Sequence, residues 1–503
     1  MHRLVQTVVR SEMSPEDREK TRRDVHEVLA AANPKEPDDP ETWPDYRLIR
    51  RHVEPTGVLS SSVGPVRQLV IDMVRYLWRI GDFQESQELG ERALAGWRAG
   101  GREDDLTTLW LRLHLANPIR SQARYAEALE IDDEVRRSLL ATAGPEHPYL
   151  VMSLSGQAAD LKGLGRYQES LDLDDEALAL ATRVLGAGAP RTIFALGNKA
   201  LSLRFIGDFR QAAKLDEQAY TLSRPLGLTR PYTLRVGASL ARDYRDLGHF
   251  TDALRLLNEI IPRSAGVHGA EHQETLAIKR ILAVTLRKLG DLEQANALTH
   301  DIRPKLERRL GRSHPEVLAC LNDLACIQSA MGDDRAALRT AESALHHYNA
   351  KLGPDHPSTL ACRNNIAIFT RKLGNHERAR SISEEVIGRF RAMLGADHPY
   401  TLACLVNRGN ELFDGGDLPG ARLNDQDVYD RLAASLGRHH PDTLAAMTNL
   451  AITLDALGDQ ANATRLTEDA LLRFRKTLGP DHPNAEAPRE GRRLNCDIDP
   501  PSL

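Results

Sequence analysis

Seven histidines recur at one place of a repeated motif, and histidine is the side chain best suited to metal binding and proton transfer near neutral pH. They are His147, His272, His314, His356, His398, His440 and His482. A zinc ion needs several ligands at about 2 Å, whereas one histidine per repeat leaves neighbours about one helix diameter, ~10 Å, apart. Most of them stand directly before a proline, which favours a helix-capping role. We therefore predict no metal site.

No other grouping of residues predicts catalysis. No Ser/His/Asp arrangement, pair of carboxylates or Cys/His site stands out beyond chance in a chain with this many polar residues. The phosphate-binding pattern Gly-x-x-x-x-Gly-Lys-[Ser/Thr] does not occur, nor does any Gly-Lys dipeptide. We therefore expect neither an enzyme nor a bound cofactor.

A second repeated column is rich in cations. It reads Trp78, Arg120, Lys162, Arg204, Arg245, Arg287, Ser329, Arg371, Phe413 and Asp455. Cations placed above one another repel unless an anion is present, and arginine favours bidentate contacts with carboxylate or phosphate. Arg242 and Arg280 are expected on adjoining columns. The alternative is that these side chains are the solvated ends of helices.

A third column ends in three asparagines. It reads His114, Gly156, Asn198, Ser239, Ile281, Asp323, Asn365, Asn407 and Asn449. Asparagine is a poor residue for a helix interior, but its amide can both donate to and accept from an extended peptide backbone. The alternative is a structural hydrogen bond between neighbouring repeats.

These columns follow from a repeat of 42 residues. Leu352-Gly-Pro-Asp-His-Pro-Ser-Thr-Leu360 returns as Leu394 to Leu402 and again as Leu436 to Leu444, and such a period indicates a stacked array. Two glycines per period divide each unit into two helices, and the proline after the second glycine suits the first turn of the next helix. We predict an all-α, right-handed α-solenoid of about ten helix pairs.

The chain is divided into three segments by these patterns: a small N-terminal helical module in residues 1–62, the repeat array in 63–482, and a C-terminal cap or tail in 483–503. Within the module, Met1 to Arg10 could form an amphipathic helix, and Ser14-Pro15-Glu16-Asp17 begins a charged helix that should stop near Asn33. One residue is missing between Gly207 and Gly227, and Pro262 and Pro304 lie inside helices. We expect superhelical curvature to change across residues 207–311.

Composition limits the partners and the compartment. The 503 residues carry a formal net charge of −5, so nothing drives the chain globally toward nucleic acid or anionic membrane. Neither a long apolar run nor a signal-peptide pattern is present. Of the five cysteines, Cys320, Cys362 and Cys404 occupy one place in successive repeats, where a buried core role is expected rather than disulfide or metal binding. We expect a cytoplasmic protein.

Each repeat tends to carry a small residue before the turn glycine, an aromatic after it and then a second small residue, as in Ala200, Gly207, Phe209 and Ala212. This pattern resembles the tetratricopeptide repeat, and the Leu-Gly-x-x-His-Pro-x-Thr-Leu connector is similar to that of the kinesin-light-chain type. Over the whole chain the sequence resembles the C-terminal part of actinobacterial NB-ARC–TPR proteins of the FxSxx-COOH system, whose nucleotide-binding domain precedes the repeats. The resemblance implies that the first helix of each pair lines a concave groove. It also implies that Asn365, Asn407 and Asn449, with Asn198 in isolation, grip a bound peptide.

We therefore predict a non-catalytic scaffold whose groove holds an extended peptide. The asparagines would hold its backbone, and cations would receive acidic side chains or a C-terminal carboxylate. The predicted cations are Arg120, Lys162, Arg204, Arg242, Arg245, Arg280, Arg287 and Arg371. The alternative is a regulatory sensor arm of an NB-ARC switch, packed on a separate NTPase. Nucleic-acid binding is the weakest reading because of the acidic balance.

Overall fold

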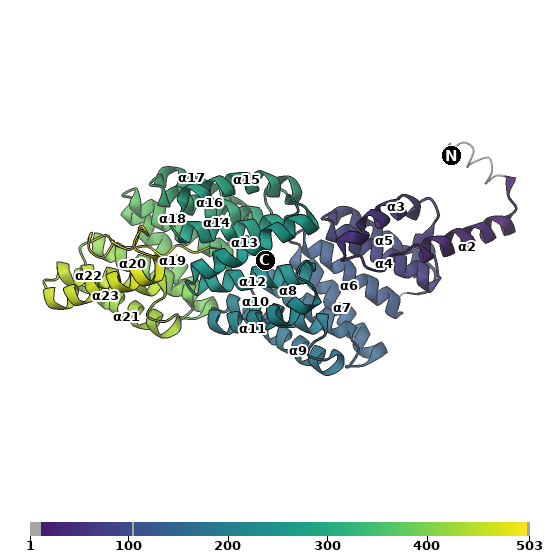
Figure 1. The fold of residues 1–503 in the computed structure, drawn as a ribbon, viewed down its shortest axis with the longest axis horizontal. Helices are drawn as coiled ribbons and strands as arrows, with labels where there is room; N and C mark the ends of the chain where they lie inside the picture. Colours follow the sequence, from purple (N-terminus) through teal and green to yellow (C-terminus); the bar gives the residue numbers. More distant parts are fainter. Residues whose placement is uncertain (1–11, 103–104, 500–503) are drawn as a thin grey trace. The chain divides into compact units, whose positions relative to one another are not determined.

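The computed structural model describes residues 12–102 and 105–499 (Figure 1). In these residues it contains α-helices, three short 3-10 helices and no strand. The predicted all-α solenoid is confirmed, while the helix expected in residues 1–10 lies outside the described residues. Every described helix is too short or too polar to span a bilayer.

The helices form two compact units, Met1–Asp160 and Leu161–Leu503. The first unit opens with α2 (Pro15–Ala31), in which the Ser14 side chain accepts from the Asp17 N–H and caps the helix as predicted. The unit continues with η1 (Pro40–Thr42), α3 (Trp43–Val53), η2 (Val58–Ser60), α4 (Gly64–Arg79), α5 (Phe83–Ala99), α6 (Leu106–Arg120) and α7 (Tyr125–Ala143). The boundary falls inside α8 (Tyr149–Gly163).

The second unit continues the helix pairs. Its first helices are α10 (Pro190–Phe205), α12 (Pro231–Asp246), α14 (Gln273–Lys288), α16 (Pro315–Ala330), α18 (Pro357–Lys372), α20 (Pro399–Asp414) and α22 (Pro441–Ala456). Its second helices are α9 (Tyr167–Leu185), α11 (Phe209–Ser223), α13 (Phe250–His268), α15 (Leu292–Leu310), α17 (Asp334–Lys351), α19 (His376–Leu394), α21 (Leu418–Ser435) and α23 (Gln460–Leu478). Each pair is joined by a tight turn, as the two glycine columns predicted.

The core lies between the helices of each pair and between neighbouring pairs. Ala200, Ala241 and Ala325, at equivalent places in the first helices α10, α12 and α16, are fully buried. Cys320, Cys362 and Cys404 are buried free thiols, so their predicted core role is confirmed.

The turn within each pair uses glycine in the left-handed region. In α10 the N–H of Gly207 donates to the carbonyl of Arg204, and the N–H of Asp208 donates to the carbonyl of Leu203, which is a Schellman turn. Gly207 has φ +88°, which disfavours any residue with a Cβ.

The histidine of each connector caps the helix that follows it. In His356, His398, His440 and His482 the ring Nδ1 accepts from the backbone N–H two residues later, at 3.1 Å in each case. Because Nδ1 accepts, the proton must lie on Nε2. The predicted capping role is confirmed.

The Nε2 of the same histidines reaches a distant repeat. His356 donates to the carbonyl of Gly163 and His398 to that of Phe205, both 193 residues earlier. His440 and His482 donate to carbonyls 194 residues earlier, in Asp246 and Lys288. These four hydrogen bonds join repeats on successive turns of the superhelix within the second unit.

The residue missing between Gly207 and Gly227 shortens a helix but does not change which repeats are joined by the histidine hydrogen bonds. Helix α11 is 15 residues long and is followed by η3 (Arg224–Leu226), whereas α9 and α13 each have 19 residues. The step from 193 to 194 residues between contacts is accounted for by the missing residue, because only the first two contacts span it. The expected change of curvature is therefore not reflected in these contacts.

The inter-turn contact predicts different costs for two matched glycine substitutions. A Cβ on Gly207 would lie 2.5 Å from Pro399 Cδ, whereas one on Gly374 would meet nothing within 4 Å, and both glycines have similar φ (+88° and +85°). We expect Gly374→Ala to cost about 1 kcal/mol for the left-handed backbone. Gly207→Ala should cost roughly 1–3 kcal/mol more, for overpacking against a rigid ring. Urea denaturation measures both, and equal losses would contradict the contact.

The connector histidines predict loss of stability in mild acid. Burial lowers the pKa of His356 and of His398 to about 4. The unfolded chain, with a pKa near 6.5, then binds more protons between these values, so stability falls as the pH falls from about 6.5 toward 4. Between pH 7 and pH 5 we expect each to lower the free energy of unfolding by about 2 kcal/mol. Urea denaturation at pH 7 and pH 5 measures this loss. His398→Asn should reduce the loss by about 2 kcal/mol. His439→Gln, which changes an exposed histidine of a connector, is the control and should leave the loss as it is.

Candidate peptide-binding groove

The C-terminal segment of the chain occupies the face formed by the first helices. Residues 493–499, called the tail below, form an extended segment that runs past α22, α20, α18 and α16, and Figure 1 shows it in yellow beside α20. Leu494, Cys496 and Ile498 are 5%, 3% and 2% exposed and join the hydrophobic core of the last repeats. The other tail residues alternate with them.

Three asparagines hold the backbone of this tail. Asn449 accepts from the N–H of Leu494 at 2.7 Å and donates to its carbonyl at 2.9 Å. Asn407 does the same with Cys496, at 3.0 and 2.8 Å. Asn365 does the same with Ile498, at 3.0 and 2.9 Å. Three successive repeats therefore bind alternate residues of the extended tail, one residue each.

A second set of asparagines, not expected from the sequence, supports the first. The amide of Asn365 donates to Asn322 at 3.1 Å, that of Asn407 to Asn364 at 3.1 Å, and that of Asn449 to Asn410 at 3.0 Å. Asn322, Asn364 and Asn410 also donate to tail carbonyls. Asn365, Asn407 and Asn449 thus make the inter-repeat hydrogen bond of the structural alternative and also bind the chain's own tail, while contact with a separate peptide stays a prediction.

The far end of the tail is acidic and meets two cations of α14. Arg287 contacts Asp497 and lies 2.6 Å from Asp499, and Lys288 lies 2.6 Å from Asp497. Burial alone would raise the pKa of Asp497, but Arg287 and Lys288 outweigh it and hold that pKa well below its usual value. Burial would also raise the pKa of Asp499, but the same two cations, with a contribution from Arg245, outweigh it and lower that pKa.

The near end of the tail is basic and meets a buried aspartate. Arg493 lies 2.8 Å from Asp425, whose side chain is 2% exposed. The guanidinium lies over the ring of Phe413, 4.7 Å from its centroid. Phe413 stands where other repeats carry a column cation, so the tail supplies the cation that this repeat lacks.

Part of the predicted basic column is paired inside the array. In the first unit Arg120 lies 2.7 Å from both Asp132 and Asp160. In the second unit Lys162 lies 2.6 Å from Asp174. These cations are neither solvated helix ends nor open to a ligand acid, because internal aspartates neutralise them.

Arg204 shows the same arrangement in the next repeat. It lies 2.5 Å from Asp243 and 3.0 Å from Asp216. The signal in the sequence is an aspartate in the second helix, nine residues after the turn: Asp132, Asp174, Asp216 and Asp425. Asp425 is the one that pairs with the tail.

The remaining predicted residues divide between groove and array. Arg371 donates to the Asn495 side chain at 2.8 Å and so contacts the tail. Arg280 pairs with Asp323 at 2.6 Å, and Arg245 with Asp246 at 2.7 Å. Arg242 is buried, and burial followed by the neighbouring Arg245, Arg204 and Arg280 lowers its pKa. Half-buried Asn198 in α10 is not among the hydrogen-bond partners found for the tail.

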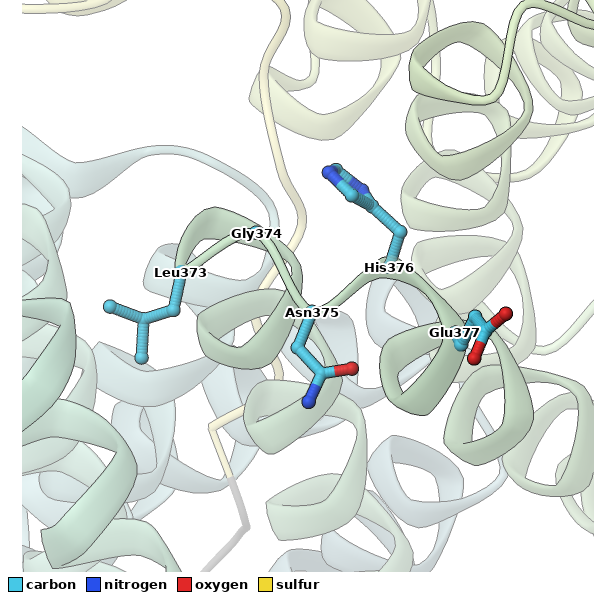
Figure 2. Close-up of a pocket in the computed structure, with 5 residues that line it drawn as sticks. All are labelled: Leu373, Gly374, Asn375, His376 and Glu377. Carbon is cyan, nitrogen blue, oxygen red and sulfur yellow. The ribbon is translucent and has the colours of Figure 1, made fainter.

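A surface hollow lies at the turn between α18 and α19, lined by Leu373, Gly374, Asn375, His376 and Glu377. Figure 2 shows that the side chains of Leu373, Asn375 and His376 point in different directions from this turn. Across the described ranges, no group of three or more His, Cys, Asp or Glu side chains is placed to hold a metal ion.

Comparison with solved structures supports the solenoid. A Rap protein in complex with Competence and Sporulation Factor aligns with a TM-score of 0.56 at 12% identity, over 73% of this chain and 98% of that chain. This likeness shows a shared fold. BtubC (BKLC) from P. vanneervenii aligns with a TM-score of 0.34 at 17% identity, over 52% of this chain and 98% of its own.

Nearly identical TPR-like repeats of a Podosopora anserina protein described as a kinesin light chain align with a TM-score of 0.33 at 23% identity, over 39% of this chain and 93% of that chain. A comparison with curated proteins finds no significant match. Tetratricopeptide repeat family models match residues 149–224, 233–274, 317–358, 359–400 and 443–484. Tetratricopeptide repeats therefore make up these five stretches of the chain.

Proposed function

We propose that this array is a protein-binding scaffold whose groove holds an extended polypeptide by its backbone. The observation that carries the proposal is the paired contact of Asn365, Asn407 and Asn449 with alternate residues of the tail. An amide that both donates to and accepts from one residue recognises the extended conformation without reading its side chain. The groove therefore selects for shape first.

Charge at the two ends of the occupied groove adds selectivity. Arg287 and Lys288 donate to two aspartates of the tail, which supports the acidic part of the predicted ligand. A free C-terminal carboxylate placed near Asp499 would face the same guanidinium, with Arg245 close enough to act on that carboxyl. Neither contact needs catalysis, so the proposed role is binding alone.

The tail already fills the groove, so a binding test needs a form in which it fits poorly. We define the charge-reversed chain as the full-length protein with Arg493→Glu, Asp497→Lys and Asp499→Lys. The ligand is a fluorescein-labelled, amidated peptide with the sequence of residues 490–499, kept reduced and followed by fluorescence anisotropy.

We expect this peptide to bind the charge-reversed chain and to depend on the asparagines. Each asparagine makes two hydrogen bonds worth about 1 kcal/mol apiece, so Asn407→Ala in the charge-reversed chain should weaken binding roughly 30-fold. Asn462→Ala, an exposed asparagine of α23, is the matched control and should leave the affinity unchanged. The proposed function would be refuted if the charge-reversed chain did not bind the peptide at concentrations up to about 1 mM. It would also be refuted if the Asn407→Ala and Asn462→Ala variants bound the peptide with equal affinity.

The carboxylate preference has its own test. The same peptide with a free C-terminal acid in place of the amide adds one negative charge beside Arg287. We expect it to bind the charge-reversed chain roughly fivefold more tightly, as for a charge-assisted hydrogen bond of about 1 kcal/mol, and Arg287→Gln should remove the difference. Equal affinities of acid and amide would limit the groove to acidic side chains.

A further inference from the structure

Side chains of the array, and not its backbone, bind the backbone of the tail. In the described residues, its backbone N–H and carbonyl groups at Leu494, Cys496 and Ile498 bond to asparagine amides, and no backbone–backbone hydrogen bond joins residues 493–499 to the helices. The first helices α16, α18, α20 and α22 are continuous, so their backbones are satisfied without it. The tail is therefore placed as a ligand is, rather than as a strand of a sheet.

Its tether is short and irregular. Helix α23 ends at Leu478, and residues 479–492 connect it to the tail through turns without a helix, with Ala485 and Ala487 buried in the core of the last repeats so that only 488–492 link this core to the tail. A segment on such a tether meets its own groove at an effective concentration on the order of millimolar. Any ligand in solution must compete with it.

One site in the array is incomplete without an occupant. Asp425 of α21 is buried and accepts from the uncharged hydroxyl of Thr453 in α22 at 2.7 Å, and Arg493 of the tail supplies the guanidinium opposite it. The equivalent aspartates Asp132, Asp174 and Asp216 are neutralised by Arg120, Lys162 and Arg204 of their own repeats. Since Phe413 replaces the cation here, this buried acid requires a cation from whatever lies in the groove.

We propose that residues 493–499 are a built-in competitor for the groove, and that the polypeptide which displaces them carries the same charge pattern. This inference rests on the proposed function. The pattern is a cation opposite Asp425, followed four and six residues later by two acids opposite Arg287 and Lys288. Between them, alternate residues are apolar, as Leu494, Cys496 and Ile498 are.

This arrangement makes the groove closed by default. A weak ligand does not open it, because the tail returns at once, and only a partner that is tight, abundant or itself tethered displaces the tail. Occupancy by a partner then releases the tail from the protein surface.

The test compares the unaltered chain with the charge-reversed chain. The amidated peptide of residues 490–499 should bind the unaltered chain at least about tenfold more weakly, because only there does a matched tail compete. A peptide in which the arginine of position 493 is changed to glutamate should lose most of its affinity for the charge-reversed chain. If both chains bind the peptide equally and through Asn407, the competitor inference is wrong while the proposed function stands. If neither binds, the proposed function itself fails.

A second measurement uses the unaltered protein alone. Cys496 is 3% exposed, and burial raises the pKa of its thiol, so alkylation is slow while the tail is docked. Excess peptide with serine in place of cysteine should speed alkylation of Cys496 at least about tenfold and leave Cys320 of α16 unchanged, as resolved by mass spectrometry. An unchanged rate at Cys496 would show a permanent cap and would overturn the inference even if charge reversal unfolds the chain.

Discussion

The asparagines can bind alternate residues of the tail only if neighbouring repeats place them at the spacing of two extended residues. An extended chain rises about 3.3 Å per residue, so this spacing is about 6.6 Å, whereas packed helices lie 8–10 Å apart. The first helices must therefore converge on their inner side, which requires a tightly curved array. The hydrogen bonds from His356, His398, His440 and His482 to carbonyls 193 or 194 residues earlier hold that curvature. The connector histidines thus help to set the geometry of the groove.

Most of the fold was predictable because its signals are local. Glycine at a positive φ, proline at a helix start and histidine before it each act within a few residues, and ten helix pairs follow from their spacing. The second bond of the histidines was not predictable, because a contact across 193 residues depends on the rotation accumulated over several repeats. The close approach of Gly207 to Pro399 was hidden for the same reason. The left-handed turn alone is enough to explain a glycine at position 207, so the sequence gives no sign of a second reason for it.

The candidate site was predictable in part. Asn365, Asn407 and Asn449 lie together on one face, because a repeat carries equivalent residues to equivalent places. The cations at Arg120, Lys162 and Arg204 were expected to need an anion, and they do, but the anions are Asp132, Asp174 and Asp216 of the same array. The position of the tail could not be predicted, because its seven residues lie outside the repeat and no periodic pattern indicates which residues they contact. Asp425 belonged to a visible column, yet only the structure shows that its cation comes from Arg493.

The asparagine ladder taken alone is degenerate. Since each amide reads only backbone, an extended chain shifted by two residues would satisfy the same hydrogen bonds, and the ladder cannot tell one frame from the next. Asp425 at one end and Arg287 with Lys288 at the other remove this ambiguity, because a shift of two residues takes Arg493 away from the first and one aspartate away from the second. The ladder fixes the spacing of the tail residues, and the two charged ends fix the register of the tail along the array.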